Sequence, residues 1–233
     1  MGRTINLERE LLKLKNPQKA KILQRFFKTG KGEYGEGDIF LGLTVSQERQ
    51  AAKKYLDLSL QELQKLFNGK FHEYRMVALF ILMEQYKKAD EKGKEEIFQF
   101  YLKNTKNINN WDLVDLSAPT IIGNYLFNKD RKILYRLARS KSLWERRIAI
   151  LSTYFFIGKN QFCDALKIAK ILLRDNHDLI HKAVGWMLRE VGKRNQKIEE
   201  KFLKKHYKNM PRTMLRYAIE KFSEEKRQKY LGN

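Results

Sequence analysis

The amino-acid sequence predicts an all-α protein, and three features of the 233-residue chain support this prediction. Apolar residues recur with the 3.6-residue period of a helix, most clearly in 72–89, where Met76 and Phe80 share one face. We find no convincing segment in which apolar and polar residues alternate as in a β-strand. Prolines, which interrupt helices, occur only at Pro17, Pro119 and Pro211.

The same period predicts further helical segments along the whole chain. They lie near 7–28, 47–67, 95–103, 110–127, 129–139, 143–157, 161–174, 178–192, 197–206 and 211–230. Short polar stretches separate several of these segments and favour turns, as at 57–59, 104–107 and 174–176. The chain therefore consists of many short helices with brief connections.

Small residues recur at matching points of every second helix, at Ala78, Ala149, Gly185 and Ala218. The steps between them are 149 − 78 = 71, about twice 36, then 185 − 149 = 36 and 218 − 185 = 33. A missing member of the series is expected near residue 114. A helix-pair repeat of this length is typical of a HEAT-like α-solenoid, so we expect one domain over 1–233, curved, with a concave face.

The charge balance indicates a polyanionic partner. Lys and Arg number 48 and Asp and Glu number 27, which leaves a net charge of +21. Nucleic acid is the simplest such partner, because each neutralised phosphate releases counterions. Basic residues on or beside the inner helices predict a basic concave face suited to a duplex; they are Arg75, Arg146, Arg147, Lys182, Arg189, Arg212 and Arg216.

Several protein classes are disfavoured. The single cysteine, Cys163, is expected in the core and allows neither an intrachain disulfide nor a Cys-based metal cluster. His177 and His181 lack a third zinc ligand at a suitable spacing, so we expect no metal and no cofactor. There is no run of eighteen apolar residues and no apolar signal core near the N-terminus. We expect a cytoplasmic monomer without membrane association.

The segment 107–126 contains the strongest candidate site. Asp115 follows Trp111 by four residues, so both side chains project from one face of a helix. Asp115 also lies one residue from the position where the other repeats carry Ala or Gly. A carboxylate there is costly unless it is paired or faces a groove. A capping or salt-bridged aspartate is the alternative interpretation.

The three tryptophans all lie beside inner-helix motifs. Trp111 and Trp186 fall near the repeat position and are candidates to flank Asp115 on the concave side. Packing in the core is the alternative, and we expect it for Trp144. Arg147 follows Trp144 by three residues; together with Arg146 it suits phosphate binding, although a solvated pair is also compatible with the pattern.

Several segments, taken in order, resemble the AlkD-type DNA alkylation-repair glycosylases over nearly the whole chain. They are FLGL at 40–43, WDLVD at 111–115, LWERRIAIL at 143–151, HKAVGWMLREVGKR at 181–194 and MPRTMLRYAIEKF at 210–222. The resemblance implies a HEAT-like α-solenoid. It also implies hydrolysis of the N-glycosidic bond of cationic N3- and N7-alkylated purines in duplex DNA, a step of base excision repair.

The resemblance implies roles for four residues: Asp115 as the catalytic aspartate, Trp111 and Trp186 beside the lesion, and Arg147 as the active-site arginine. We expect further DNA contacts from basic residues of the inner helices, which are Arg146, Lys182, Arg189 and Arg212. No lysine is placed as a Schiff-base nucleophile, so a monofunctional glycosylase without strand cleavage is expected.

Two positions depart from the family pattern. Phe26 stands where some members carry a tyrosine, and Phe155 where some carry a lysine. The lost hydroxyl and the lost charge are expected to weaken backbone contacts or to alter lesion preference. The alternative function is a non-catalytic HEAT-repeat module that binds branched or damaged DNA, or a protein scaffold. Charge favours DNA, and a carboxylate between two tryptophans is a feature that simple binding does not require.

Overall fold

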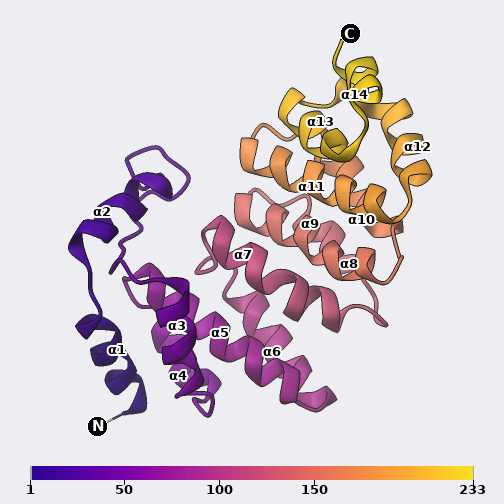
Figure 1. Cartoon of the computed structure of the whole chain (residues 1–233). Helices are drawn as coiled ribbons and strands as arrows, with labels where there is room; N and C mark the ends of the chain where they lie inside the picture. The colour runs from indigo at the N-terminus through magenta and orange to yellow at the C-terminus, as the bar shows by residue number, and fades with distance from the viewer. Residues whose placement is uncertain (1, 233) are drawn as a thin grey trace. The chain divides into compact units, whose positions relative to one another are not determined.

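A computed structural model describes residues 2–232, and these residues confirm the all-α prediction (Figure 1). Within them, β-structure is limited to one isolated bridge between Ile39 and Phe71. The chain forms two compact units, Met1–Leu113 and Val114–Asn233. Each unit is built from helices that stack in pairs.

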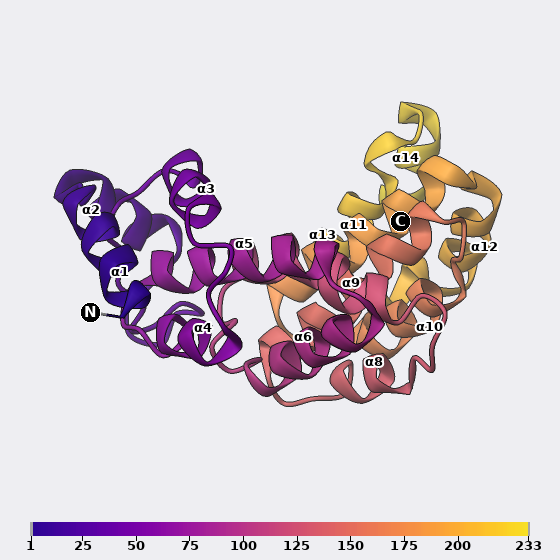
Figure 2. The same cartoon turned by 90° about the horizontal axis from the view of Figure 1, so that it is seen from below.

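The first unit contains six complete helices and the start of a seventh. They are α1 (Arg3–Lys13), α2 (Pro17–Phe26), α3 (Val45–Lys53), α4 (Leu60–Phe67), α5 (His72–Lys88), α6 (Glu91–Lys103) and the beginning of α7 (Trp111–Ala118). Helix α5 is the centre of this unit: α3, α4 and α6 pack against it, and α1 packs against α3 and α4 (Figure 2). Most of α5 is buried, which explains why it is apolar on nearly every side.

A buried carboxylate shapes the segment 40–43 of the first unit. Glu73 on α5 accepts hydrogen bonds from the backbone amides of Leu41, Gly42 and Leu43, at 2.8, 2.8 and 3.3 Å. Gly42 has a φ of +90°, and a Cβ there would lie 2.7 Å from the backbone nitrogen of Ala20. The FLGL motif is therefore explained by local packing, because only glycine fits this conformation and this space.

The second unit contains the rest of α7 and seven further α-helices. It continues through η1 (Pro119–Gly123), α8 (Lys132–Leu137), α9 (Leu143–Gly158), α10 (Cys163–Ile171), η2 (Leu172–Arg174), α11 (Asp178–Arg194), α12 (Gln196–His206), η3 (Tyr207–Asn209), α13 (Arg212–Ala218), η4 (Ile219–Lys221) and α14 (Glu224–Leu231). Helices α9, α11 and α13 lie against one another in chain order. Helices α8, α10 and α12 each pack against a member of this row, which gives the expected helical pairs.

The small residues of the predicted repeat are buried in the structure. Ala78, Ala149 and Ala218 are buried, and the fully buried Val114 occupies the predicted missing position. A Cβ at Gly185 on α11 would lie 2.5 Å from the Cβ of Tyr217 on α13, too close for any other residue. The positions predicted from residue spacing are therefore buried, and close helix approach is seen at Gly185.

Several predicted helices are divided in the structure, among them 47–67, which forms α3 and α4. The segment 7–28 breaks before Pro17, because Asn16 caps a new helix by accepting a hydrogen bond from the backbone of Lys19. The segment 110–127 changes from an α-helix to a π-helix at Pro119, which has no backbone N–H to donate. The segment 211–230 breaks after η4, where Ser223 caps α14.

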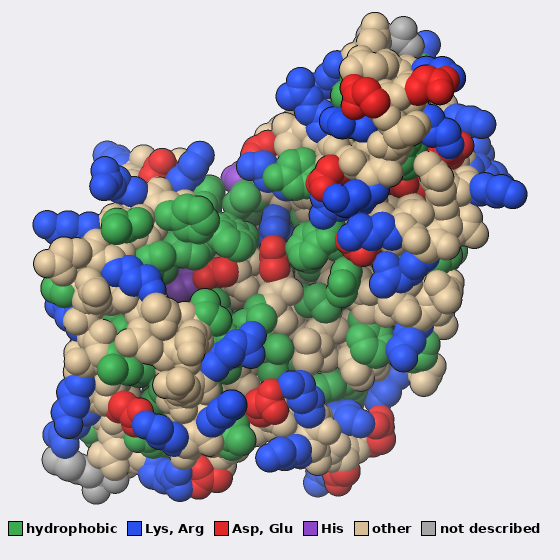
Figure 3. All heavy atoms as spheres, in the orientation of Figure 1, with side chains coloured by type: hydrophobic (Ala, Val, Ile, Leu, Met, Phe, Trp, Pro, Cys, Tyr) green, Lys and Arg blue, Asp and Glu red, His purple; other side chains and the backbone are tan. Residues whose placement is uncertain are grey.

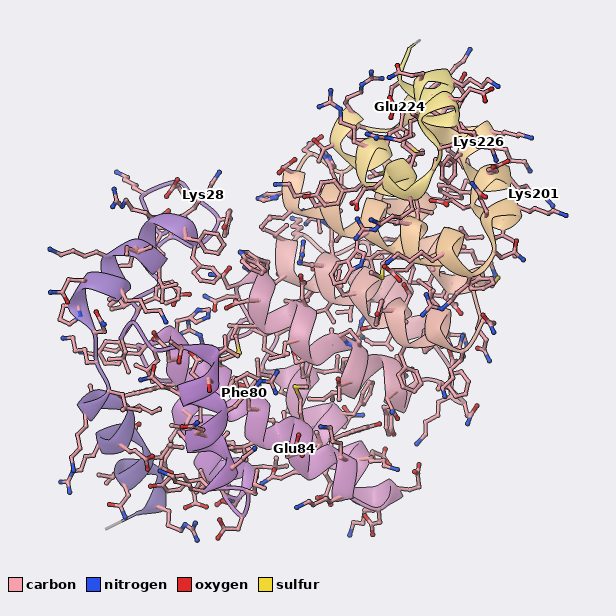
Figure 4. All side chains as sticks on the ribbon, viewed as in Figure 1. Lys28, Phe80, Glu84, Lys201, Glu224 and Lys226 are labelled. Atoms are coloured by element: carbon pink, nitrogen blue, oxygen red, sulfur yellow. The ribbon has the colours of Figure 1, made fainter. Side chains whose placement is uncertain are left out.

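Charged and aromatic side chains join neighbouring helices at the surface. Lys226 on α14, labelled in Figure 4, pairs with Glu200 on α12 at 2.5 Å. Arg49 on α3 lies 4.2 Å from the ring centre of Phe80 on α5. On the face seen in Figure 3, basic side chains mixed with acidic ones surround α14 of the second unit, and hydrophobic side chains gather beside α2 of the first.

Candidate functional site

Asp115 on α7 is held by Arg147 on α9 in a two-pronged ion pair within the second unit. Nε of Arg147 donates to Oδ1 of Asp115 and Nη2 donates to Oδ2, both at 2.7 Å. The third guanidinium nitrogen, Nη1, donates to the backbone carbonyl of Leu179. Arg147 is 5% exposed, whereas 18% of the Asp115 side chain remains open to solvent. The carboxylate is fixed in orientation and still reachable.

This pairing gives Arg147 contacts that the sequence did not predict. Arg147 was expected to hold a phosphate, but its guanidinium is buried and bound to Asp115 and to the chain at Leu179. Three of its N–H groups already donate within the protein, so a phosphate contact by Arg147 stays a prediction that these bonds do not favour. The salt-bridged interpretation of Asp115 is therefore correct in its geometry, and it is compatible with a partly exposed carboxylate.

Trp111 begins α7 and is half-buried against aromatic residues of the first unit. Its ring stacks on Phe27 with centroids 5.2 Å apart and an interplanar angle of 23°. Phe27 stacks in turn on Phe40 at 5.0 Å. Because α7 runs from Trp111 to Ala118, Trp111 and Asp115 lie one helical turn apart, as the sequence predicted. Trp111 is therefore a supported ring rather than a fully enclosed core residue.

Trp186 lies on α11 of the second unit and is also half-buried. Its indole Nε1 donates to Glu190 one turn later at 3.3 Å, and its ring lies 5.9 Å from that of the exposed Tyr154 on α9. Trp144, by contrast, is buried, which confirms the core position expected for it. The two tryptophans assigned to the site thus both keep part of their surface open.

The four predicted DNA-binding residues divide into two kinds. Arg146 binds Asp175 at 2.6 Å and the carbonyls of residues 140 and 141, and Arg189 is paired with Glu220. Both of these arginine side chains are mostly buried. Lys182 pairs with Asp178 at 2.7 Å, but 40% of its side chain remains exposed. Arg212 is exposed and donates to the carbonyl of residue 231.

The two departures from the family pattern occupy different surroundings. Phe26 is 61% exposed and meets Phe27 and Trp111 edge-on, at centroid distances of 5.1 and 5.9 Å. Phe155 is half-buried and packs edge-on against Phe127 at 5.6 Å. Phe26 therefore extends the aromatic group of Trp111 to the surface, whereas Phe155 contributes to packing between η1 and α9 of the second unit.

Sequence reasoning missed a buried ionic cluster around His72 in the first unit. Nδ1 of His72 lies 2.8 Å from Oδ2 of Asp38, and Nε2 lies 2.9 Å from Oδ2 of Asp112. Arg75 also pairs with Asp38. The available signal was the presence of charged residues, His72 and Arg75 among them, at the start of a mostly buried helix. No spacing rule links them to residues more than thirty positions away.

Other expectations concerned single residues and metals. Cys163 is exposed at the start of α10, so its expected place in the core is wrong. His177 caps α11 by accepting a hydrogen bond from the backbone of Leu179 at 3.1 Å. Residues 2–232 contain no group of three or more His, Cys, Asp or Glu side chains arranged to hold a metal ion.

In the described chain, no helix has both the length and the apolar character needed to cross a membrane. A sequence comparison with curated proteins gives no match. Two solved structures are similar in fold. A predicted DNA alkylation repair enzyme from Enterococcus faecalis has a TM-score of 0.69 at 17% identity, over 90% of this chain and 97% of that one. AlkD2 from Streptococcus mutans has a TM-score of 0.56 at 19% identity, over 89% and 99% of the respective chains.

At these identities the structural likeness establishes the fold, which is the predicted all-α solenoid of helical pairs. The family is established by sequence. Residues 7–222 match the model of the DNA alkylation repair enzymes, a span that covers most of both units and includes every candidate site residue. The chain therefore belongs to the DNA alkylation repair enzyme family.

Proposed function

We propose that this protein is a monofunctional DNA glycosylase that hydrolyses the N-glycosidic bond of cationic N3- and N7-alkylated purines in duplex DNA. The observation that carries the proposal is the Asp115 carboxylate, which is fixed by Arg147 at two 2.7 Å contacts and yet remains partly exposed. A protein that only binds DNA does not need an oriented acidic group facing a polyanion, since the two repel each other.

The chemistry of the lesion explains why one carboxylate is sufficient. Alkylation at N3 or N7 gives the purine a positive charge, so the base leaves with the electrons of the glycosidic bond as a neutral molecule. Positive charge then develops on the deoxyribose. A fixed carboxylate beside the sugar stabilises this charge more in the transition state than in the ground state. No strong general acid is required.

Hydrolysis is completed by water. Its oxygen forms a bond to C1′ of the sugar as the purine leaves, and one proton passes to solvent or to the carboxylate. The products are the free alkylpurine and an abasic site. We assign to Asp115 the stabilisation of the sugar and the orientation of this water. No covalent enzyme intermediate and no cofactor enter this scheme.

Arg147 acts in this scheme as a positioning residue. Its two donors fix the plane of the Asp115 carboxylate, so little reorganisation is needed when charge develops on the sugar. The guanidinium also lowers the net negative charge that the phosphates meet. The sugar and the water would approach Asp115 through the part of its side chain that remains exposed, 18%.

Trp111 and Trp186 are proposed to present their ring faces to the cationic lesion and the sugar. Such a cation–π contact contributes about 1–2 kcal/mol when it is desolvated. Binding of the duplex by a basic concave face stays a prediction. Lys182 and Arg212 fit it better than Arg146 and Arg189, whose guanidinium groups are committed to Asp175 and Glu220.

The test is release of 7-methylguanine from a duplex by the purified protein. Asp115→Asn should abolish most of the release while leaving affinity for the duplex unchanged or higher. Asp164→Asn is a matched control, because Asp164 is also paired with an arginine, Arg131, and its side chain is similarly exposed, at 15%. Equal rates for wild type and Asp115→Asn would refute the mechanism. Duplex binding by the wild type without base release would favour the non-catalytic alternative.

A further inference from the structure

We propose that His72 is a positioning residue for Trp111: it holds the start of α7 through a closed ring of buried hydrogen bonds, so that Trp111 is presented at a fixed angle. The inference rests on the proposed function, in which Trp111 faces the lesion. The ring lies wholly within the first unit and uses residues that the mechanism above leaves without a role.

The ring starts from the two nitrogens of His72, which is buried. Nδ1 faces Oδ2 of Asp38 at 2.8 Å, and Nε2 faces Oδ2 of Asp112 at 2.9 Å. An ionised carboxylate only accepts hydrogen bonds, so both ring nitrogens must donate. His72 is therefore an imidazolium clamped between two aspartates.

The ring closes around the backbone of Trp111. Asp38 also accepts from the side-chain amide of Asn110 at 3.4 Å, and the carbonyl of that amide accepts from the backbone N–H of Trp111 at 2.9 Å. Asp112, the next residue after Trp111, is the other ligand of His72. The chain neighbours of Trp111 are thus both tied to His72: Asn110 through Asp38, and Asp112 directly.

Stacked aromatic side chains also connect His72 to Trp111. His72 stacks on Phe40 with centroids 4.5 Å apart, Phe40 stacks on Phe27, and Phe27 stacks on Trp111. A backbone hydrogen bond from His72 to the carbonyl of Ile39, at 2.8 Å, ties this segment to α5. The plane of Trp111 is therefore set by a column of rings whose base is the imidazolium.

The charge of the cluster supports this assignment. Burial by itself would lower the pKa of His72, but the charges and hydrogen bonds of Asp112 and Asp38 outweigh burial and raise that pKa to about 10. Arg75 is the other cation of the group, and Glu48 on α3 also lies close enough to interact with His72 and Asp112. His72 remains charged at neutral pH, so the clamp is permanent rather than a switch.

The experiment follows the three tryptophans separately, using the full chain labelled with 5-fluorotryptophan. Fluorine resonances are assigned from Trp111→Phe, Trp144→Phe and Trp186→Phe. His72→Gln should move or broaden the Trp111 resonance and leave the other two in place. The single amide group of glutamine cannot replace the two imidazole nitrogens, which donate in opposite directions to Asp38 and Asp112. Gln85→Leu is the control: Gln85 is also a hydrogen-bonded residue of α5, but it bonds to the carbonyls of Leu56 and Leu58.

A second variant covers the case in which His72→Gln does not fold. Asp112→Asn keeps a hydrogen-bonding partner for Nε2 but removes one of the two charges. The pKa of His72 should fall, and the Trp111 resonance should become dependent on pH near that lower value. Nitrogen NMR of the wild type at pH 8 should show both nitrogens of His72 protonated. A neutral ring, or a Trp111 resonance identical in wild type and variants, overturns the proposal.

The activity measurement separates this proposal from the proposed function. Single-turnover release of 7-methylguanine by His72→Gln should fall on the order of tenfold to a hundredfold, as expected for a displaced contact near the reacting centre, with duplex affinity little changed. An unchanged rate overturns the positioning role. If the wild type itself releases no base, the proposed function fails, and the fluorine resonances still decide whether His72 fixes Trp111.

Discussion

Arg147 binds Asp115 through two guanidinium nitrogens, each 2.7 Å from a different carboxylate oxygen. This relationship joins α9 to α7 and turns an aspartate with an uncertain role into one with a defined orientation. It also means that Arg147 binds a residue of the protein itself and need not bind DNA to have a role. Predictions about DNA binding and predictions about catalysis can therefore be separated.

Arg147→Ala should reduce base release by about a hundredfold or more, because it leaves Asp115 without the partner that orients it. Arg147→Lys should retain part of the rate, since lysine keeps the charge but cannot bond to both oxygens in one plane. Affinity for an undamaged duplex, measured at several salt concentrations, should stay close to that of the wild type. A clear loss of affinity with a smaller salt slope would instead restore a phosphate contact for Arg147.

Gly185→Ala should destabilise the second unit by about 1–3 kcal/mol, because a Cβ at this position would collide with α13 at Tyr217 and Met214. Urea unfolding followed by circular dichroism measures the change. Gly158→Ala is the matched control on α9, where a Cβ would meet nothing within 4 Å. That variant should be neutral or slightly more stable. Equal stabilities for the two variants would contradict the close contact between α11 and α13.

Lys182→Ala and Arg212→Ala should each weaken duplex binding equally for all DNA sequences. Each should also reduce the slope of the logarithm of the binding constant against the logarithm of the salt concentration by about 1, as for the loss of one phosphate contact. Both side chains are partly exposed. Lys132→Ala removes an exposed lysine of α8, on the same unit, and serves as the control. Titrations at four salt concentrations would be decisive. A slope reduced equally by Lys132→Ala would indicate diffuse attraction rather than a defined contact.

The stability of the second unit should decrease between about pH 4.5 and pH 8 because of Glu199. Burial, and secondarily the charge of Glu200, raises the pKa of Glu199 to about 8, and Oε1 has no hydrogen-bond partner among the described residues. The folded state therefore holds this proton more tightly than the unfolded state. The resulting stability is complete below the unfolded pKa and is lost as the pH rises through the folded pKa.

Glu199→Gln removes that titration. The variant should be more stable than the wild type by about 2–4 kcal/mol at pH 9, and the difference should shrink towards pH 5. Thermal unfolding at a series of pH values measures both effects. Glu200→Gln, on the same helix, is the control and should change the profile far less. A constant offset between wild type and Glu199→Gln at all pH values would show that the effect does not come from ionisation.

The helical repeat could be predicted because its signals are local. The 3.6-residue period follows from one buried face per helix, and the small residues at 149, 185 and 218 mark the points where backbones approach each other. The pair of Trp111 and Asp115 was found for the same reason, since residues four apart on a helix share a face.

The partners of buried charges could not be predicted in this way. Asp38 and His72 are 34 positions apart and Arg147 and Asp115 are 32 apart, and nothing in their spacing shows that they meet. The division of the segment 7–28 was also missed, although Asn16 followed by Pro17 is a recognisable start of a helix. Tertiary packing decides the ionic partners, whereas the chain itself decides the helices.

The π-helix at Pro119–Gly123 sets the angle about the helix axis between Asp115 and Gly123, which lie on one continuous helical segment. Asp115 lies before it, and Gly123, at its end, lies against α9, where a Cβ would come within 2.9 Å of the Cβ of Phe155. A π-helix carries one more residue in its turn than an α-helix, which is a rotation of about 100° for everything downstream. Deleting a single residue from 119–123 would rotate the carboxylate away from its arginine or the glycine away from its neighbour. A homologue that lacks this extra residue would need a compensating insertion to keep both the pair of Asp115 with Arg147 and the contact of Gly123 with α9.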